Sequence, residues 1–161
     1  MKVAVIGTGY VGLVTGTCFA DTGNTVTCVD VDVAKVEMLL NGKLPIYEPH
    51  LENLVSRNIK HNRLFFTTNL EKAIEDAQLI FLALPTPPGE DGSADLSYVL
   101  GVANDLGKII KDYKVIINKS TVPVGTSKKV ADAIKENATV DFDVVSNPEF
   151  LREGFAIEDF K

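Results

Sequence analysis

Short, mostly apolar runs and longer amphipathic segments alternate along the whole chain. Runs of strand length occupy residues 3–6, 25–30, 64–67, 79–84, 115–118 and 143–146. Between them, apolar residues recur every three or four positions over residues 11–21, 34–41, 50–57, 70–76, 96–111 and 127–136, the period of a helix with one buried face. The pattern therefore predicts six strands and six helices in βαβα order.

Turn residues support the predicted helix boundaries. Gly23-Asn24 is expected to end the first helix and Asn41-Gly42 the second, while Asn69 is placed to cap the helix at 70–76. Strands that are apolar on both faces and joined by helical crossovers indicate a parallel sheet covered on both sides. With right-handed crossovers, two βαβαβ halves predict an α/β fold with a doubly wound, mostly parallel six-stranded sheet, the Rossmann dinucleotide-binding arrangement.

Size and composition favour one compact domain spanning residues 1–161. Of the 161 residues, 45% are hydrophobic, enough to bury one core. The net charge of −6 and the lack of a Lys or Arg cluster argue against nucleic-acid binding. The most apolar run, 79–84, is too short for a bilayer and the N-terminus resembles no leader, so we expect a cytoplasmic protein without membrane attachment. Cys18 and Cys28 are expected to be buried hydrophobes, and no metal-ligand spacing occurs.

Three glycines follow the first predicted strand in a GxGxxG spacing. Gly7 suits a tight turn, Gly9 lets a pyrophosphate approach backbone N–H groups, and Gly12 is expected to let the helix pack close to the sheet. The start of the helix would add free N–H donors and a partial positive charge. The alternative is a tight βα turn with no ligand.

An acidic residue ends the second predicted strand at the position that reads the adenine ribose. Asp30 lies 18 positions beyond Gly12, where its carboxylate can accept both ribose hydroxyls and repel a 2′-phosphate. Asp32 strengthens this repulsion, and Lys35 is the only cation nearby. The spacing therefore predicts NAD, in preference to NADP, as the cofactor.

Three later strands lead into loops rich in proline and polar residues, at the sheet edge where ligands bind such folds. Thr86 and Thr121 in two of these loops suit either a site or a capping and turn role. Glu149 and Glu153 are four residues apart and would share one helix face if Pro148 began a helix, although a solvated face is the commoner meaning of such a pair. Phe150, Leu151, Phe155, Ile157 and Phe160 then form a dense apolar tail, which we expect to collapse onto the sheet, fray or drive self-association.

Five motifs in this order resemble the amino-terminal portion of the UDP-glucose 6-dehydrogenase group of nucleotide-sugar dehydrogenases. They are KVAVIGTGYVGLVTG, LPIYEPHLENL, the TPP loop with DGSADLSYV, NKSTVPVGT and SNPEFLREG, and together they cover the whole chain. The resemblance implies oxidation of UDP-glucose to UDP-glucuronate by two NAD molecules through a covalent thioester.

The resemblance also assigns roles to individual residues. Thr121 and Glu149 would help to position or activate water. The implied NAD contacts are Gly7, Gly9, Tyr10, Val11, Gly12, Asp30, Lys35, Leu84, Pro85, Thr86, Pro87, Pro88, Ser120, Thr121, Val122 and Glu153. The implied contacts to the sugar nucleotide are Glu149, Phe150, Leu151, Arg152 and Glu153.

Members of this family continue into a connecting helix and a second domain that carries the nucleophilic cysteine. Neither Cys18 nor Cys28 is placed to replace it, since one is predicted in a helix–sheet interface and the other in a strand. We therefore expect an isolated cofactor domain that binds NAD without turnover and holds only part of a UDP-glucose site. The full-length protein is expected to form a homodimer or a higher homo-oligomer.

Other functions fit parts of the same pattern. A relative acting on GDP-mannose or a UDP-N-acetyl sugar would share the motifs, although IYEPHL leans toward UDP-glucose by similarity. A non-catalytic NAD sensor would account for the absent thiol but gives no purpose to SNPEFLREG or Thr121. A hydroxy-acid dehydrogenase would explain the glycine motif and none of the later ones.

Overall fold

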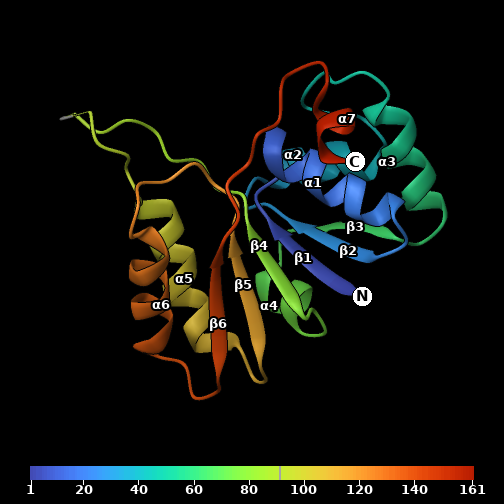
Figure 1. Cartoon of the computed structure of the whole chain (residues 1–161). Helices are drawn as coiled ribbons and strands as arrows, with labels where there is room; N and C mark the ends of the chain where they lie inside the picture. The colour runs from blue at the N-terminus through green and yellow to red at the C-terminus, as the bar shows by residue number, and fades with distance from the viewer. Residues whose placement is uncertain (91) are drawn as a thin grey trace.

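The computed structural model describes residues 1–90 and 92–161, and within them the predicted α/β fold is confirmed. The strands form one sheet in the order β3-β2-β1-β4-β5-β6, and every neighbouring pair is parallel (Figure 1). Their bounds are β1 (Lys2–Ile6), β2 (Thr25–Val29), β3 (Leu64–Thr67), β4 (Leu79–Leu82), β5 (Lys114–Asn118) and β6 (Phe142–Ser146). The order reverses between β1 and β4, which is where doubly wound sheets open a crevice for a ligand.

The six predicted helices are present, and a seventh follows β6. Their bounds are α1 (Tyr10–Asp21), α2 (Val33–Leu40), α3 (Leu51–Lys60), α4 (Leu70–Ile74), α5 (Ser97–Ile109), α6 (Thr126–Lys135) and α7 (Ala156–Phe160). Asn69 caps α4 as predicted, since its side-chain oxygen accepts the Lys72 N–H at 2.9 Å. Gly23 and Gly42 follow α1 and α2 with φ of 96° and 73°, values that glycine adopts without strain.

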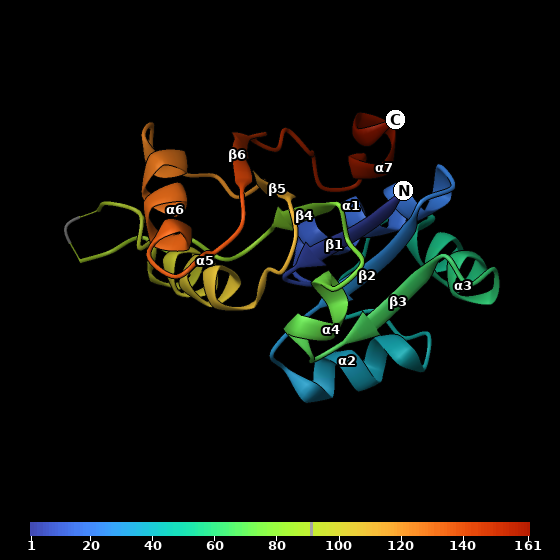
Figure 2. The same cartoon turned by 90° about the horizontal axis from the view of Figure 1, so that it is seen from below.

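Helices cover the sheet on two sides because alternate strand residues point to opposite faces. Val3 and Val5 of β1 belong to a core with α1, α2, α3 and α7, whereas Ala4 and Ile6 belong to a second core with α4, α5 and α6. Figure 2 gives a second view of this arrangement. Cys18 and Cys28 are buried in the first core, as predicted. Among the helices of residues 1–90 and 92–161, none combines the length and apolar character needed to cross a bilayer.

The apolar tail collapses, but onto α1 and not onto the sheet. Ala156 and Ile157 of α7 are buried, and the Phe160 ring packs edge-on against Phe19 of α1 with 5.0 Å between ring centres. Phe150 and Phe155 remain 84% and 53% exposed. In Figure 1 the chain rises from β6 and turns back to place α7 beside α1. The helix was missed because five residues are too few to show a period.

The helix envisaged from Pro148 does not form. Residues 147–152 have no helical structure, and the Glu149 carboxylate accepts the N–H of Leu151 at 2.7 Å. A side chain bonded to the backbone two residues ahead holds a local turn that competes with a helix. Glu149 and Glu153 therefore do not share a helix face.

The close packing of α5 against α6 gives a test of the fold. A Cβ added to the buried Gly107 of α5 would lie 2.3 Å from the carbonyl oxygen of Ile134, so Gly107→Ala must push the two helices apart. We expect a loss of about 1–3 kcal/mol in the free energy of unfolding, measured by urea denaturation. Gly101→Ala in the same helix is the matched control, because no atom of the described residues lies within 4 Å of its added Cβ. The control should be stabilised by up to about 1 kcal/mol, and equal stability of the two variants would contradict the packing.

Candidate functional site

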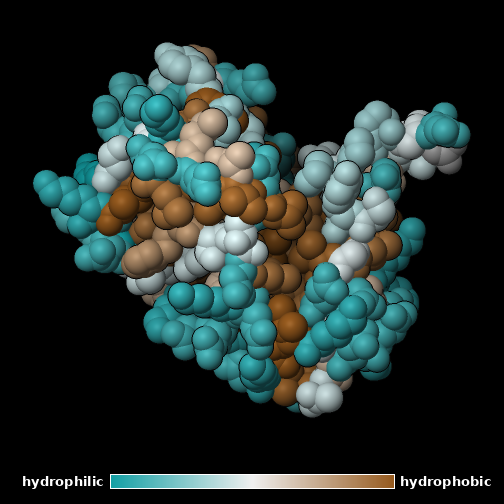
Figure 3. All heavy atoms as spheres, turned by 180° about the vertical axis from the view of Figure 1, so that it is seen from behind, coloured by the Kyte–Doolittle hydropathy of each residue, from teal (hydrophilic) through white to brown (hydrophobic). Residues whose placement is uncertain are grey.

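A cleft of about 760 Å³ opens at the carboxyl edge of the sheet, beside the ends of β1 and β4, where the strand order reverses. Figure 3 shows a hollow lined by hydrophobic residues between the two halves of the molecule. Twelve of the residues predicted for the site lie in its lining: Gly7, Gly9, Tyr10, Val11, Asp30, Lys35, Leu84, Pro85, Thr86, Ser120, Thr121 and Glu149. The topology thus brings together residues from the loops after β1, β2, β4, β5 and β6.

Two glycines of the GTGYVG motif are required by close backbone contacts. Gly7 has φ of 100°, and a Cβ there would lie 2.2 Å from the carbonyl oxygen of Ala83. A Cβ on Gly12 would lie 2.0 Å from the carbonyl oxygen of Gly7. The same Cβ would lie 3.2 Å from Ala83 Cβ, so Gly12 brings α1 close to the ends of β1 and β4, as predicted. Gly12 itself is absent from the cleft lining formed by the described residues.

Gly9 has a different role, because it faces open space. No atom of the described residues lies within 4 Å of a Cβ built on it. It is the N-cap of α1, and no side chain of the described residues caps the helix there. The N–H groups of the first helical turn therefore remain available at the cleft, together with the positive end of the helix dipole. This combination suits a phosphate group.

Asp30 is held at the cleft wall by donors from the same turn. Its Oδ2 accepts the Thr8 hydroxyl at 2.6 Å and the Thr8 N–H at 3.0 Å, and its Oδ1 accepts the Asp32 N–H at 3.1 Å. Burial raises the pKa of this carboxyl, but the bonds from Thr8, Asp32 and Lys35 outweigh it and lower the pKa to about 2. Asp30 is therefore an anion at neutral pH.

The Lys35 ammonium group is paired with this anion and is therefore not a free cation in the cleft. Its Nζ is 3.1 Å from Asp30 Oδ2, while Asp32 caps α2 by accepting the Lys35 N–H at 3.1 Å. Among the described residues that line the cleft, Lys35 is the one cation, and it is thus paired with the residue that would repel a 2′-phosphate. This pairing leaves the preference for a non-phosphorylated ribose intact.

Side-chain hydroxyls tie together the loops after β4 and β5. Ser120 Oγ accepts the Leu84 N–H at 2.9 Å and donates to the Leu84 carbonyl at 2.8 Å, and the Thr86 hydroxyl donates to the Thr121 carbonyl at 2.8 Å. Ser120 and Thr86 therefore support the cleft wall as well as lining it. The Thr121 residue is exposed at the cleft. Of the predicted contacts in these loops, Pro87, Pro88 and Val122 lie outside the lining formed by the described residues, and Asp91 of the DGSADLSYV motif lies outside the described part of the chain.

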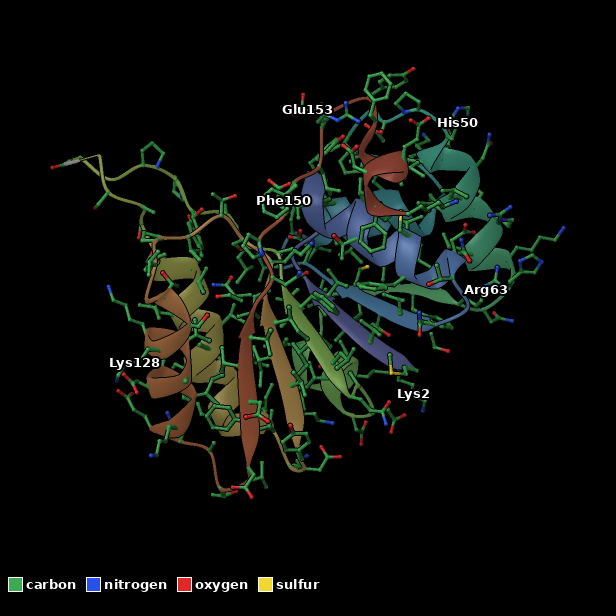
Figure 4. The ribbon with its side chains drawn as sticks, in the orientation of Figure 1. Lys2, His50, Arg63, Lys128, Phe150 and Glu153 are labelled. Atoms are coloured by element: carbon green, nitrogen blue, oxygen red, sulfur yellow. The ribbon has the colours of Figure 1, made fainter. Side chains whose placement is uncertain are left out.

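Of the residues in the SNPEFLREG motif, only Glu149 belongs to the described lining of the cleft. Arg152 pairs instead with Asp159 at 2.6 Å, Leu151 packs against the core that contains α1, and Phe150 and Glu153 are exposed. Figure 4 shows Phe150 closer to the sheet than Glu153, which lies farther along the segment toward α7. The predicted sugar-nucleotide contacts from 150 to 153 are therefore not gathered at this cleft.

Several residues of the site were missed by sequence reasoning. Thr8 occupies a variable position of the glycine motif, yet its hydroxyl and N–H hold Asp30. Tyr98 and Val102 of α5 line the cleft, and their spacing of four residues is the signal that could have identified them. Lys119, the first residue after β5, is buried next to the described lining of the cleft, with its Nζ 3.1 Å from Asn147 Oδ1, and burial lowers its pKa.

Both cysteines are unsuited to nucleophilic chemistry. Burial raises the pKa of Cys18 to about 11 and that of Cys28 to about 12, so neither forms a thiolate near neutral pH. In the described part of the chain, no group of three or more metal-ligating side chains is assembled.

Known dehydrogenases share both the sequence and the fold of this chain. It is 53% identical over 160 residues to UDP-glucose 6-dehydrogenase TuaD of Bacillus subtilis and 50% identical over 163 residues to UDP-glucose 6-dehydrogenase of Rhizobium meliloti. These alignments cover 98% and 100% of this chain but 35% and 37% of those proteins. The chain thus spans little more than a third of the length of these relatives.

Solved structures extend the comparison to other sugars. A UDP-glucose dehydrogenase from Pyrobaculum islandicum superposes with a TM-score of 0.94 at 45% identity, over 98% of this chain and 38% of that one. GDP-mannose dehydrogenase from Pseudomonas aeruginosa gives 0.91 at 36% identity, and UDP-D-ManNAc dehydrogenase from Pyrococcus horikoshii gives 0.91 at 26%, each over 99% of this chain and 38% of the other. Residues 1–161 also match the family described as "UDP-glucose/GDP-mannose dehydrogenase family, NAD binding domain". The chain therefore belongs to the UDP-glucose/GDP-mannose dehydrogenase family, as an NAD-binding domain of that family.

Proposed function

We propose that this chain is the cofactor-binding part of an enzyme that oxidises UDP-glucose to UDP-glucuronate with two NAD. The observation that carries the proposal is the juxtaposition of Gly9, open to the cleft at the start of α1, with the anionic Asp30. The start of α1 offers N–H donors for a pyrophosphate, and Asp30, bonded to the neighbouring Thr8, offers carboxylate oxygens for ribose hydroxyls.

The cleft residues suit NAD in their charge and in the number of hydrogen bonds that they can still accept. An ionised carboxylate has about four acceptor positions. Within the described residues, Asp30 Oδ1 accepts one bond, from Asp32, so ribose hydroxyls can be added without displacing Thr8. Val11, Leu84 and Tyr98 supply apolar cleft surface. NAD, when bound, supplies the hydride acceptor, and these residues bind and orient it.

Thr121 and Glu149 are the residues of this chain that we assign to the chemical step, because both reach the cleft from neighbouring strand ends. Their proposed role is to position or activate water. The attacking thiol is assigned to another part of the full-length enzyme, since Cys18 and Cys28 are buried here.

UDP-glucose is the proposed substrate on the strength of similarity, and not on the strength of the fold. Dehydrogenases of three different nucleotide sugars superpose on this chain with TM-scores of 0.91 to 0.94. Identity is higher for the UDP-glucose enzymes, at 40–53%, than for the GDP-mannose enzyme at 36%. The choice among sugars thus rests on sequence identity.

The Gly9→Ala variant tests NAD binding without a change in the stability of the fold. The residue has φ of −68°, which alanine adopts freely, and the added methyl would project into the open cleft. We expect an unfolding midpoint close to that of the unaltered chain and NAD binding weaker by about tenfold or more, measured by isothermal titration. Gly101→Ala, which adds a methyl to an exposed helix position, should bind NAD normally. Unchanged NAD affinity in Gly9→Ala would contradict this position for the pyrophosphate.

Asp30→Asn tests the choice between NAD and NADP. The unaltered chain should bind NAD measurably, NADP much more weakly and UDP-glucose feebly. Removing the negative charge while keeping the shape should weaken NAD binding by about tenfold and strengthen NADP binding. Asp132→Asn removes an equal charge from α6, where Asp132 pairs with Lys128, and should change neither affinity. If Asp30→Asn leaves the ratio of the two affinities unchanged, Asp30 does not read the ribose.

The buried thiols predict binding without turnover by this chain alone. Mixed with NAD and UDP-glucose, it should produce no NADH above a protein-free background, followed by absorbance. Accumulation of NADH from UDP-glucose would show that the residues of this chain suffice for oxidation and would overturn the assignment of the thiol elsewhere.

A further inference from the structure

A buried carboxylate lies outside the proposed cofactor contacts and joins three distant parts of the chain. Glu48, in the link between α2 and α3, is only 5% exposed. Its Oε2 accepts the Tyr10 hydroxyl at 2.6 Å and the Gly154 N–H at 2.7 Å, and its Oε1 accepts the Ala156 N–H at 2.9 Å. The two backbone partners are more than 100 residues away in sequence, so these bonds are purely tertiary.

The partners of Glu48 belong to two functional regions. Tyr10 is the first residue of α1 and lines the cleft beside Gly9. Gly154 and Ala156 lie at the junction between residues 147–155, which we call the linking segment, and α7. The linking segment carries Glu149, the proposed water-activating residue. Glu48 is therefore bonded on one side to the dinucleotide-binding turn and on the other to the segment that bears the acidic residue.

The cost of burying the Glu48 carboxylate indicates that this residue fixes the position of its partners and does not only stabilise the fold. A buried carboxylate costs several kcal/mol of solvation unless donors surround it. Burial raises the pKa of Glu48, but bonds from Tyr10, Gly154 and neighbouring backbone N–H groups outweigh it and lower the pKa. The same arrangement, with burial as the larger cause, raises the pKa of Tyr10. A displaced linking segment would take the Gly154 and Ala156 N–H donors away from this carboxylate, so the bonds favour the observed placement of the segment.

We propose that Glu48 is a positioning residue that locks the linking segment to the first turn of α1 and thereby sets the place of Glu149 relative to the cofactor cleft. This inference rests on the proposed function, because it gives the cleft and Glu149 their roles. Its physical content, a carboxylate that couples Tyr10 to Gly154, is measurable with or without a cofactor.

A second acidic residue offers a matched comparison. Asp159 of α7 also binds the linking segment, since it accepts the Arg152 N–H at 2.9 Å and pairs with the Arg152 guanidinium. Among the described residues, the bonds of Asp159 go to Arg152 and not to Tyr10. The Tyr10 hydroxyl also donates to the Arg152 carbonyl, at 3.5 Å. Loss of Asp159 therefore loosens the segment and leaves the Glu48 bridge to Tyr10 intact, whereas loss of Glu48 removes that bridge and leaves the Asp159–Arg152 pair.

The experiment compares Glu48→Gln, Asp159→Asn and Tyr10→Phe with the unaltered chain, and takes exposed Glu52→Gln as the control. Hydrogen exchange of the Gly154 and Ala156 amides reports the segment. Because the chain has four tyrosines, a residue-resolved NMR titration reports the Tyr10 hydroxyl. Isothermal titration with NAD reports the cleft. In Glu48→Gln we expect exchange at both amides faster by about tenfold, a Tyr10 titration shifted toward lower pH, and NAD binding weaker by about tenfold.

The other variants separate coupling from simple anchoring. Asp159→Asn should leave the Tyr10 titration unchanged and NAD affinity within about twofold, and Glu52→Gln should match the unaltered chain throughout. Tyr10→Phe should speed exchange at Gly154 through the shared Oε2 of Glu48. If Glu48→Gln does not fold, this last measurement decides, and unchanged exchange at Gly154 in Tyr10→Phe overturns the proposal.

The outcomes keep the two proposals apart. Normal amide exchange and an unshifted Tyr10 titration in Glu48→Gln would overturn the positioning role whatever the affinity for NAD. Equal loss of NAD affinity in Glu48→Gln and Asp159→Asn would show that Glu48 only holds α7 in place, and it would also overturn the positioning role. Failure of the unaltered chain to bind NAD would overturn the proposed function, while the exchange and titration results would still decide the role of Glu48.

Discussion

The close approach of backbone to backbone at the first crossover is the constraint on which the site depends. The carbonyl oxygens of Gly7 and Ala83 occupy the space that Cβ atoms of Gly12 and Gly7 would need. With those side chains absent, α1 starts directly beside the carboxyl ends of β1 and β4. The direction of its first N–H groups, and hence the place where a phosphate can lie, follows from this packing.

Polar groups around that turn are satisfied within the protein and still leave capacity for a ligand. Thr8 donates both its hydroxyl and its N–H to Asp30, and Lys35 neutralises part of the same charge. The carboxylate is thus oriented and ionised before any ribose arrives, which reduces the entropy lost on binding. A short stretch of sequence from Gly7 to Lys35 contains all of these groups, so this half of the site is built by nearly local contacts.

That locality explains which features could be predicted from the sequence. The strands and the glycine turn have local signals, namely apolar runs and fixed spacings, and the structure confirms the sheet they predict. α7 and the path of residues 147–152 have no such signal, because a buried Glu48 and the inward turn of Glu149 decide them. Phe150 and Arg152 were assigned by resemblance to a sugar-nucleotide site, and the first is exposed while the second is bonded to Asp159.

The two halves of the site therefore differ in how much they can vary. Contacts near Gly7 and Asp30 leave little freedom, since a single methyl group or a lost charge alters them directly. The linking segment is held by long-range bonds at its two ends, from Asn118 and Lys119 to Asn147 and from Glu48 to Gly154 and Ala156, while Phe150 between them is exposed. Dehydrogenases named for three different sugars superpose on nearly the whole chain with TM-scores of 0.91 to 0.94, so the backbone of this domain does not distinguish among them and side chains must.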